Sequence, residues 1–189
     1  MNRNENIAPV ISSFRQLYPF SESELAMIVD RLQTKEYKKS SYLLKKGAVC
    51  KGLTFILSGS MRQYSDTEKG DITIRFFIEH NWVVDYQSFM GQKPSDYDIE
   101  VMEPCTVLYL DIDDIHQLIG ANPSFFTLGK LFEHGTDIRS QVDYKKTPDE
   151  RYKHLLETRP EWIQRFSLTQ IASYLGISPE TLSRVRSRI

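Results

Sequence analysis

The sequence SLTQIASYLGISPETLSRVRSR near the C-terminus constrains the fold of this chain more than any other segment. Gly176 divides it, and glycine tolerates the positive φ that a tight turn between two helices requires. Ser167 and Gln170 have the spacing of a capping box at the start of a first helix. Ser178 and Pro179 suit the N-cap and the first position of a second helix. We therefore predict two short helices joined by a tight turn.

The apolar positions of this segment predict how the two helices pack. Ala172 provides a small residue where the second helix crosses the first. Larger apolar residues fall where the two inner faces meet, namely Ile171, Leu175, Ile177, Leu182 and Val185. Any two short amphipathic helices would give a similar pattern, but here the small residue, the glycine and both caps agree in register. The segment thus predicts a helix-turn-helix, whose second helix can lie in the major groove of DNA.

The outward face of the second helix is polar, as it would be in a solvated helix or in one that reads DNA. Glu180 can accept a hydrogen bond from the amine of cytosine, and Arg184 can donate two to guanine. The candidate DNA-binding residues are Thr169, Ser178, Glu180, Thr181, Ser183, Arg184 and Arg188. Residues 145–189 hold nine Lys and Arg against five Asp and Glu, whereas the rest of the chain holds fifteen against twenty. An acidic body with a basic tail suits a sensor joined to a DNA-binding unit.

The composition is that of a globular protein with one large domain or two small ones, since 40% of the 189 residues are hydrophobic. Cys50 and Cys105 could pair, but two buried reduced thiols are favoured, and a structural zinc site or four-cysteine cluster lacks ligands. The opening MNRNENIAPV has no apolar signal core, and no apolar run approaches membrane-spanning length. We expect a cytoplasmic protein that needs no membrane, metal or cofactor.

The rest of the chain divides into helical and strand-rich parts. Residues 6–18 and 22–33 are predicted as helices, the second capped by Ser21 and Glu24. From Glu36 onward, short runs rich in β-branched and aromatic residues alternate with turn signals, which predicts a β-roll or jelly roll. The runs are SYLL (41–44), LTFIL (53–57), DITIRFFI (71–78), WVV (82–84), DIEVM (98–102) and TVLYL (106–110).

A helix of about twenty residues is predicted over 123–143, with one apolar face. The face consists of Phe125, Leu128, Leu131, Phe132, Gly135, Ile138 and Val142. It could pack on its own β-roll, but dimerisation is the favoured interpretation, because a lone helix between two domains often buries such a stripe against a partner. Residues 144–149 are predicted as a hinge, and Thr147 with Glu150 caps a helix that ends before Pro160.

This order of elements resembles the cyclic-AMP receptor protein/FNR family of bacterial transcription regulators. The segment LTFILSGSMRQY (53–64) is similar to the family's strand-glycine-strand turn, and ISPETLSRV (177–185) to its recognition helix. The resemblance implies a homodimer that binds double-stranded DNA and RNA polymerase, with base contacts from Glu180 and Arg184. Pro179 stands where the family often has a third contact, an arginine.

The predicted fold is therefore α+β, in three parts. Residues 1–121 form a jelly-roll, cyclic-nucleotide-binding-like β-roll with flanking helices. Residues 122–146 form the dimerisation helix and the hinge, and residues 147–189 form the helix-turn-helix domain. The family places a β-hairpin wing before this domain, but only PEWIQRF (160–166) is available here, so we expect a short wing or none.

The sensor departs from the nucleotide-binding members, in which a Gly-Glu pair holds the ribose and an Arg-Ser/Thr-Ala run holds the phosphate. In the matching stretch, Asp85 could replace the glutamate, whereas Ser95 and Asp96 fall where the arginine run would be. Asp96 and Asp98 would repel a phosphate, so cyclic-AMP binding in the usual manner is not expected. An unknown effector could instead contact Trp82, Asp85, Tyr86, Ser95 and Tyr97, although these aromatics could equally fill the interior of the roll.

Two other functions are open at this point. The chain could be a β-roll that binds a small molecule and no DNA, or an enzyme of the cupin class. A cupin metal site uses two histidines one residue apart, and the histidines at 80, 116, 134 and 154 have no such spacing. No nucleophile triad or phosphate-binding loop is present either, so no catalytic residue is predicted.

Overall fold

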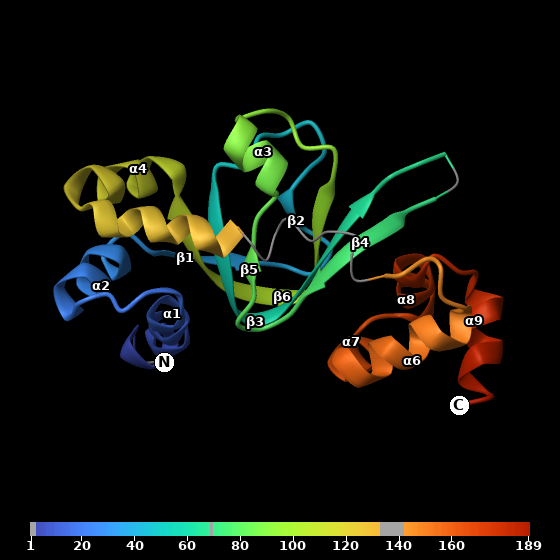
Figure 1. The fold of residues 1–189 in the computed structure, drawn as a ribbon. Coiled ribbons are helices and arrows are strands. Elements are labelled where there is room, and N and C mark those ends of the chain that lie inside the picture. Colours follow the sequence, from blue (N-terminus) through green and yellow to red (C-terminus); the bar gives the residue numbers. More distant parts are fainter. Residues whose placement is uncertain (1–2, 69, 133–141) are drawn as a thin grey trace. The chain divides into compact units, whose positions relative to one another are not determined.

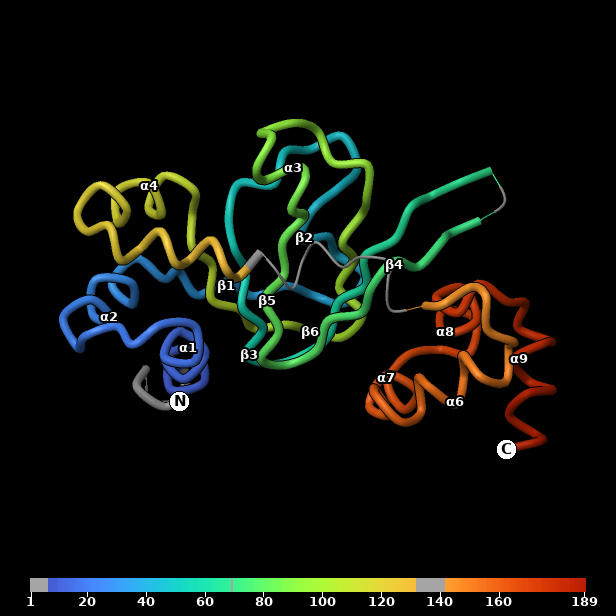
Figure 2. Tube along the Cα trace, in the orientation of Figure 1, coloured from blue at the N-terminus to red at the C-terminus, as the bar shows by residue number. Residues whose placement is uncertain are grey.

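The computed structural model describes residues 3–68, 70–132 and 142–189. Figure 1 labels its elements, and Figure 2 follows the chain between them. The first elements are α1 (Arg3–Leu17), α2 (Glu22–Val29), β1 (Gln33–Tyr37), β2 (Tyr42–Leu44), β3 (Gly52–Ser65), β4 (Ile72–Phe77) and β5 (Trp82–Val83). They are followed by α3 (Tyr86–Gly91), β6 (Asp98–Asp111), α4 (Ile112–Ala121), the 3₁₀-helix η1 (Pro123–Phe132), α6 (Pro148–Thr158), α7 (Pro160–Arg165), α8 (Leu168–Leu175) and α9 (Pro179–Arg186).

Packing divides the chain into two units. The first unit comprises Met1–Met61 and Phe77–Thr136, and the second comprises Arg62–Phe76 and Asp137–Ile189. Strand β3 therefore begins in the first unit and ends in the second, and β4 returns the chain to the first unit at Phe77. Boundaries drawn from the sequence at residues 121 and 146 did not anticipate that the hairpin between β3 and β4 would group with the C-terminal helices.

The first unit is an antiparallel β-roll, as predicted. Its sheet has the strand order β1-β6-β3-β4, while β2 also pairs with β6 and β5 with β3. Strand β1 runs antiparallel to β6 from the pair Gln33–Tyr109 to the pair Tyr37–Cys105. Helices α1, α2 and α4 lie together beside the strands (Figure 1). The sequence did not predict β1, because QTKEY is polar and is held by backbone pairing rather than by an apolar face.

The core of this unit is formed by large apolar side chains from strands and helices together. Phe14 of α1, Phe55 of β3, Leu118 of α4 and Phe125 of η1 are fully buried. Removing such surfaces from water is the main favourable term in folding. Cys50 and Cys105 are both buried and no disulfide joins them, which agrees with the prediction of two reduced thiols.

The predicted capping box of α2 is present and has an additional role. The Ser21 amide donates to the Glu24 carboxylate at 2.8 Å, and the Glu24 amide donates to Ser21 Oγ at 3.3 Å. The same carboxylate accepts hydrogen bonds from Ser124 Oγ at 2.5 Å and Asn122 Nδ2 at 3.0 Å. The hydroxyl of Ser124, followed by Ser21, lowers the pKa of Glu24. One carboxylate therefore connects the start of α2 to the start of η1.

Two predicted strand breaks are absent. The stretch 53–64, expected to form a strand-glycine-strand turn, belongs to the single strand β3, and residues 98–102 and 106–110 both belong to β6. Gly59 takes a φ of +93° within β3, where a side chain would meet the backbone of Pro104 and come within 2.6 Å of Cys105 Sγ. The glycine thus permits the close approach of β6 instead of ending a strand.

The predicted dimerisation helix is also corrected. Residues 123–132 form a 3₁₀-helix, and Phe125, Leu128 and Leu131 are at most 4% exposed within the core of the first unit. Phe125 stacks on Phe20 with 5.7 Å between ring centroids. These three side chains pack on their own roll, so their assignment to a dimer surface was wrong. Gly135 and Ile138 lie outside the described residues.

The second unit contains four helices from residues 148–186 together with the hairpin. Thr147 and Glu150 form the predicted capping box of α6, with the Thr147 amide 2.8 Å from the Glu150 carboxylate. The helix ends at Thr158, before Pro160, as predicted. Residues 160–165, the only stretch available for a wing, form helix α7, and no strand occurs between residues 142 and 189.

Candidate nucleic-acid interface

Helices α8 and α9 form the predicted helix-turn-helix. The Ser167 amide donates to Gln170 Oε1 at 3.0 Å, and the Gln170 amide donates to Ser167 Oγ at 3.3 Å. Ser178 Oγ caps α9 by accepting from the Thr181 amide at 3.1 Å. Gly176 has a φ of +67°, and a Cβ there would lie 2.7 Å from the ring of Tyr144. Local sequence signals therefore fix both helix starts and the turn.

The inner face of the pair is buried as predicted, except for Ile177 in the turn, which is only half-buried. Ala172 at the crossing is fully buried, as are the apolar residues that surround it, Ile171, Leu175, Leu182 and Val185. Arg151 of α6 donates from Nη1 to the carbonyl oxygen of Leu175 at 2.5 Å. This bond satisfies a carbonyl that the end of α8 would otherwise leave without a partner. Sequence reasoning missed Arg151, because nothing local to α8 indicates a contact from α6.

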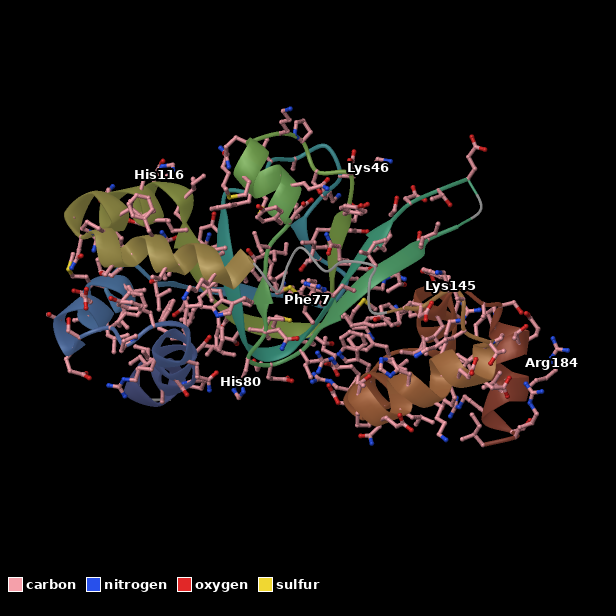
Figure 3. All side chains as sticks on the ribbon, in the orientation of Figure 1. Lys46, Phe77, His80, His116, Lys145 and Arg184 are labelled. Carbon is pink, nitrogen blue, oxygen red and sulfur yellow. The ribbon has the colours of Figure 1, made fainter. Side chains whose placement is uncertain are left out.

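The candidate base-reading side chains lie on the outward face of α9. Glu180, Ser183 and Arg184 are exposed, and Figure 3 shows Arg184 pointing away from the helix into solvent. Arg184 Nη2 lies 3.4 Å from Thr181 Oγ1, and Thr181 is half-buried. A hydrogen bond from the Ser178 hydroxyl, together with the nearby charge of Arg184, lowers the pKa of Glu180. Glu180 is therefore ionised at neutral pH and can only accept hydrogen bonds.

The other three candidates occupy different environments. Thr169, in the first turn of α8, and Ser178, in the turn before α9, are both exposed. Arg188 forms an ion pair with Asp149 of α6, with 3.0 Å between Nη2 and Oδ2. Both partners are largely exposed, so the pair contributes little to stability, and Arg188 can exchange Asp149 for a phosphate.

The structure brings three of the five candidate effector residues into one hydrogen-bond network. Asp85 is 1% exposed and accepts from the Ser88 amide at 3.2 Å and from the Ser95 hydroxyl at 2.5 Å. The Tyr97 amide in turn donates to Ser95 Oγ at 3.0 Å. Asp85 thereby caps α3, a helix that the sequence analysis did not predict.

The remaining two effector candidates pack against the core. Trp82 donates from Nε1 to Ser13 Oγ at 2.9 Å, and its ring lies 5.4 Å from Phe14 and 5.1 Å from Phe55. Tyr86, the first residue of α3, is half-buried beside the same core. These positions fit the interpretation in which the aromatics fill the roll.

A cavity of about 190 Å³ in the roll involves residues that the sequence did not single out. Its apolar lining includes Leu44, Val84 and Ile99. Lys35 Nζ, also in the lining, lies 3.3 Å from the centroid of the Tyr109 ring, a cation–π contact. Burial lowers the pKa of Lys35 and raises that of Tyr109, whose hydroxyl donates to Asp111 at 3.1 Å. Because the sequence analysis did not predict β1, it could not find the contact between Lys35 and Tyr109.

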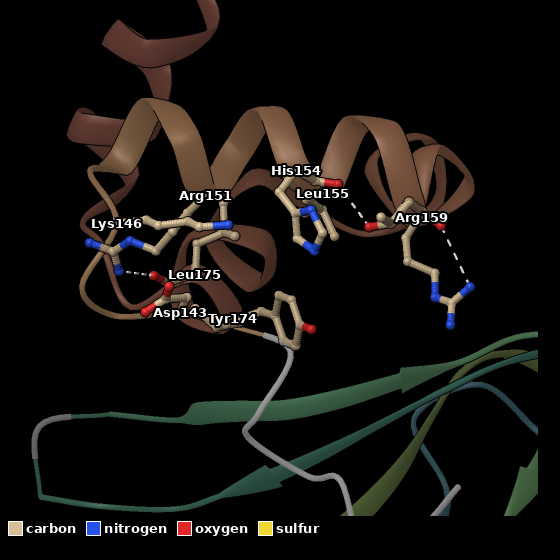
Figure 4. Close-up of a pocket in the computed structure, with 10 residues that line it drawn as sticks. Asp143, Lys146, Arg151, His154, Leu155, Arg159, Tyr174 and Leu175 are labelled. Atoms are coloured by element: carbon tan, nitrogen blue, oxygen red, sulfur yellow. Dashed lines mark hydrogen bonds between the residues drawn. The ribbon is translucent and has the colours of Figure 1, made fainter.

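A larger pocket of about 520 Å³ lies in the second unit, beside α6 (Figure 4). Its rim carries three basic side chains, Lys146, Arg151 and Arg159, together with His154 and the acidic Asp143. Its apolar lining includes Leu155 and Leu175. These basic side chains come from α6 and its flanking residues, whereas the candidate base-reading residues come from α9. They therefore form a separate set that adds to the positive charge of the unit.

Further properties limit the chemistry of the described residues. Among them, no three His, Cys, Asp or Glu side chains are grouped so that they could hold a metal ion. No helix among the same residues has the length and apolar character needed to span a bilayer.

Residues 34–122 match the family model of the cyclic nucleotide-binding domain. The chain is 26% identical to the fumarate and nitrate reduction regulatory protein of Yersinia pestis and 28% identical to that of Vibrio cholerae serotype O1. Each alignment covers 90% of this chain and 74% of the relative. The solved structure of FixK2 from Bradyrhizobium japonicum matches with a TM-score of 0.67 at 17% identity, over 83% of each chain. At this level of identity, the similarity to FixK2 shows a shared fold alone.

Proposed function

We propose that the chain is a DNA-binding transcription regulator of the Crp/Fnr family that contacts the double helix through α8 and α9. The observation that carries this proposal is the exposed polar face of α9 on a helix pair whose caps, turn and inner face are all satisfied. Glutamate and arginine on such a face can distinguish base pairs in the major groove. The Crp/Fnr-type relatives support the same conclusion.

Selection from random DNA duplexes tests this function. We expect the full-length protein to enrich a defined site, because Glu180 and Arg184 offer two different base contacts. The double variant Glu180→Ala/Arg184→Ala should lose the enrichment while remaining folded, since both side chains are exposed. Absence of enrichment with the unaltered protein would contradict the proposal and favour a β-roll that binds only a small molecule.

The homodimer and its contact with RNA polymerase are part of the same proposal. A two-fold dimer presents two copies of α9 to successive major grooves, which is how helix-turn-helix proteins reach two half-sites. Because Phe125, Leu128 and Leu131 pack within their own unit, the dimer must use other residues. The proposal assigns no residue to RNA polymerase.

We further propose that cyclic AMP is not held in the family's usual manner. The buried Asp85 carboxylate already accepts hydrogen bonds from Ser88 and Ser95. Asp96 is exposed, and Asp98 accepts from the Lys46 amide at 3.1 Å. An anionic phosphate would meet these carboxylates in a segment that has no arginine and only one basic residue, Lys93. The contacts of Trp82, Asp85 and Ser95, and the packing of Tyr86 on the core, favour a structural role, which leaves Tyr97 as the candidate effector-facing residue.

A further inference from the structure

The hairpin between β3 and β4 supplies an aromatic side chain to the helices of the DNA-binding unit. Phe76 is 1% exposed, and its ring stacks on Phe166 with 4.0 Å between centroids and 23° between planes. It also meets the edge of Trp162 at 5.3 Å and lies 5.8 Å from Tyr174. Trp162 and Tyr174 meet edge-on at 5.3 Å. Phe76 therefore belongs to a cluster of four rings, three of which come from α7, α8 and the residue between them.

The backbone of the hairpin is bonded to α8 through one hydroxyl. Ser173 Oγ accepts from the Thr73 amide at 2.9 Å and donates to the carbonyl oxygen of Asp71 at 2.8 Å. Strand β4 is the last in the sheet order, so among the described residues no strand lies next to its outer backbone groups. An edge strand of this kind needs partners for its amides and carbonyls. Ser173 provides both partners, and the contact fixes the position of α8 along the hairpin.

The hairpin is itself held together where it meets the helices. The Arg62 guanidinium, on β3, lies 2.7 Å from the Asp71 carboxylate beside β4, and the Arg62 side chain is only 8% exposed. Arg62 also lies over the ring of Tyr64 at 4.2 Å. Because the ion pair joins the two sides of the hairpin, the backbone groups that face Ser173 are held in a fixed arrangement.

Size explains why the helices need this contribution. The C-terminal helices span residues 148–186, about forty residues, which is close to the length at which a chain buries too little apolar surface to be stable without support. A fourth ring from outside the helices enlarges their core.

We propose that Phe76 and Ser173 are positioning residues for DNA binding: the hairpin completes the core of the helix-turn-helix unit and holds α8 in the arrangement that leaves the α9 face exposed. Ser173 and Tyr174 contact the hairpin, whereas Glu180 and Arg184 stay open to solvent, so the docked hairpin is compatible with DNA binding. The part of this inference that concerns DNA rests on the proposed function.

Removal of the Ser173 hydroxyl tests the docking directly in the full-length chain. We expect Ser173→Ala to increase hydrogen exchange of the Thr73 amide, measured by NMR, roughly tenfold, the factor that corresponds to one ordinary hydrogen bond. Ser173→Thr retains the hydroxyl and should retain the protection. Thr158→Ala is the matched control, because its hydroxyl bonds only within α6, to His154 at 2.7 Å. Unchanged Thr73 exchange in Ser173→Ala would overturn the docking.

Removal of the Phe76 ring tests its effect on DNA binding. We expect Phe76→Ala to weaken binding to the selected site about tenfold, because three ring contacts are lost. In a Trp82→Phe background, the emission of Trp162 should also shift to longer wavelength. Phe126→Ala, which removes a 67% exposed ring from the first unit, should change neither. Circular dichroism at the assay temperature verifies that each variant is folded.

The outcomes separate this inference from the proposed function. A protein that selects no DNA would contradict the proposed function, while Thr73 exchange and Trp162 emission would still report on the hairpin. A protein that selects a site and binds it equally well as Phe76→Ala would show that Phe76 does not position the helix pair. Weaker DNA binding in Ser173→Ala with recovery in Ser173→Thr is the result that a positioning role requires.

Discussion

In the proposed function, Arg184 and Glu180 are the residues expected to determine which base pairs α9 can distinguish. Arg184 is exposed, with only a long 3.4 Å contact to Thr181, so its guanidinium can turn toward a base edge without losing a strong bond. Glu180 is kept ionised by the Ser178 hydroxyl and is limited to accepting hydrogen bonds. Pro179 at the first position of α9 has no side-chain donor. The helix therefore offers two polar readers of opposite charge, one turn apart.

Arg184→Ala is expected to cost about 1–3 kcal/mol at the selected site and to relax the preference at one base pair, because a bidentate contact to guanine is lost. Selection from random duplexes, followed by titration of the best sites, measures both effects. Arg186→Ala, the same change of charge on the same helix, should weaken binding without altering base preference. An unchanged preference in Arg184→Ala would mean that Arg184 contacts phosphate or solvent.

Gly176→Ala is expected to destabilise the second unit by about 1–3 kcal/mol, since the new side chain must adopt a left-handed conformation. Its Cβ would also press on Tyr144, 2.7 Å away. Urea unfolding followed by circular dichroism, which reports on the helices of both units, measures the change. Gly120→Ala is the matched control: it lies in α4 with nothing within 4 Å of the added Cβ, and it should stabilise its helix by about 0.5–1 kcal/mol. Equal stability of Gly176→Ala and the unaltered protein would contradict the turn assignment.

At the scale of elements, the sequence predicted best those parts whose signals are local. The capping boxes at Ser21, Thr147 and Ser167 lie within four residues of the helices that they start, and the structure confirms all three. The apolar stripe after Pro123 gave no indication of its partner, because packing on the roll and packing on a second copy require the same residue types. The role of Phe76 was equally hidden, since its contacts lie far along the chain.

The segment that contains the candidate effector residues shows the same difference between local signals, which the sequence reveals, and distant contacts, which it does not. The sequence placed Asp85 and Ser95 in one functional stretch, and the structure joins them by a 2.5 Å hydrogen bond. Helix α3 between them is six residues long, too short to show a periodic pattern. The cavity that contains Lys35 and Tyr109 depends on the pairing of β1 with β6, which no local pattern specifies.

Cyclic AMP and cyclic GMP are expected not to bind the protein at micromolar concentration. The Asp85 carboxylate is already paired with Ser88 and Ser95, and this segment has no arginine to pair with a phosphate. Isothermal titration calorimetry with each nucleotide measures whether it binds. A saturable heat with micromolar affinity would show that a different part of the roll binds the phosphate. Asp85→Ala would then indicate whether its carboxylate takes part in that binding.

At the scale of the whole molecule, two units with opposite charge are joined by more than one segment. Strands β3 and β4 pass between the units, as does the chain that leads into the C-terminal helices. The basic residues are concentrated after residue 144, where an acidic polymer would be contacted. Within the second unit, Phe76 and Ser173 join the hairpin to the helices.

The protein is expected to be a homodimer that selects a site with two-fold symmetry and half-sites about one helical turn apart. Multi-angle light scattering measures whether the protein is a dimer. The sequences of the selected duplexes show whether the site has two-fold symmetry. Leu131→Asp should lower the melting temperature, because it places a charge in the core of the roll, where Leu131 is 4% exposed. Its effect on dimerisation is therefore not a test of the interface. A monomeric mass at the concentration that saturates DNA, together with selected sites that lack symmetry, would contradict the dimer while leaving the reading role of α9 intact.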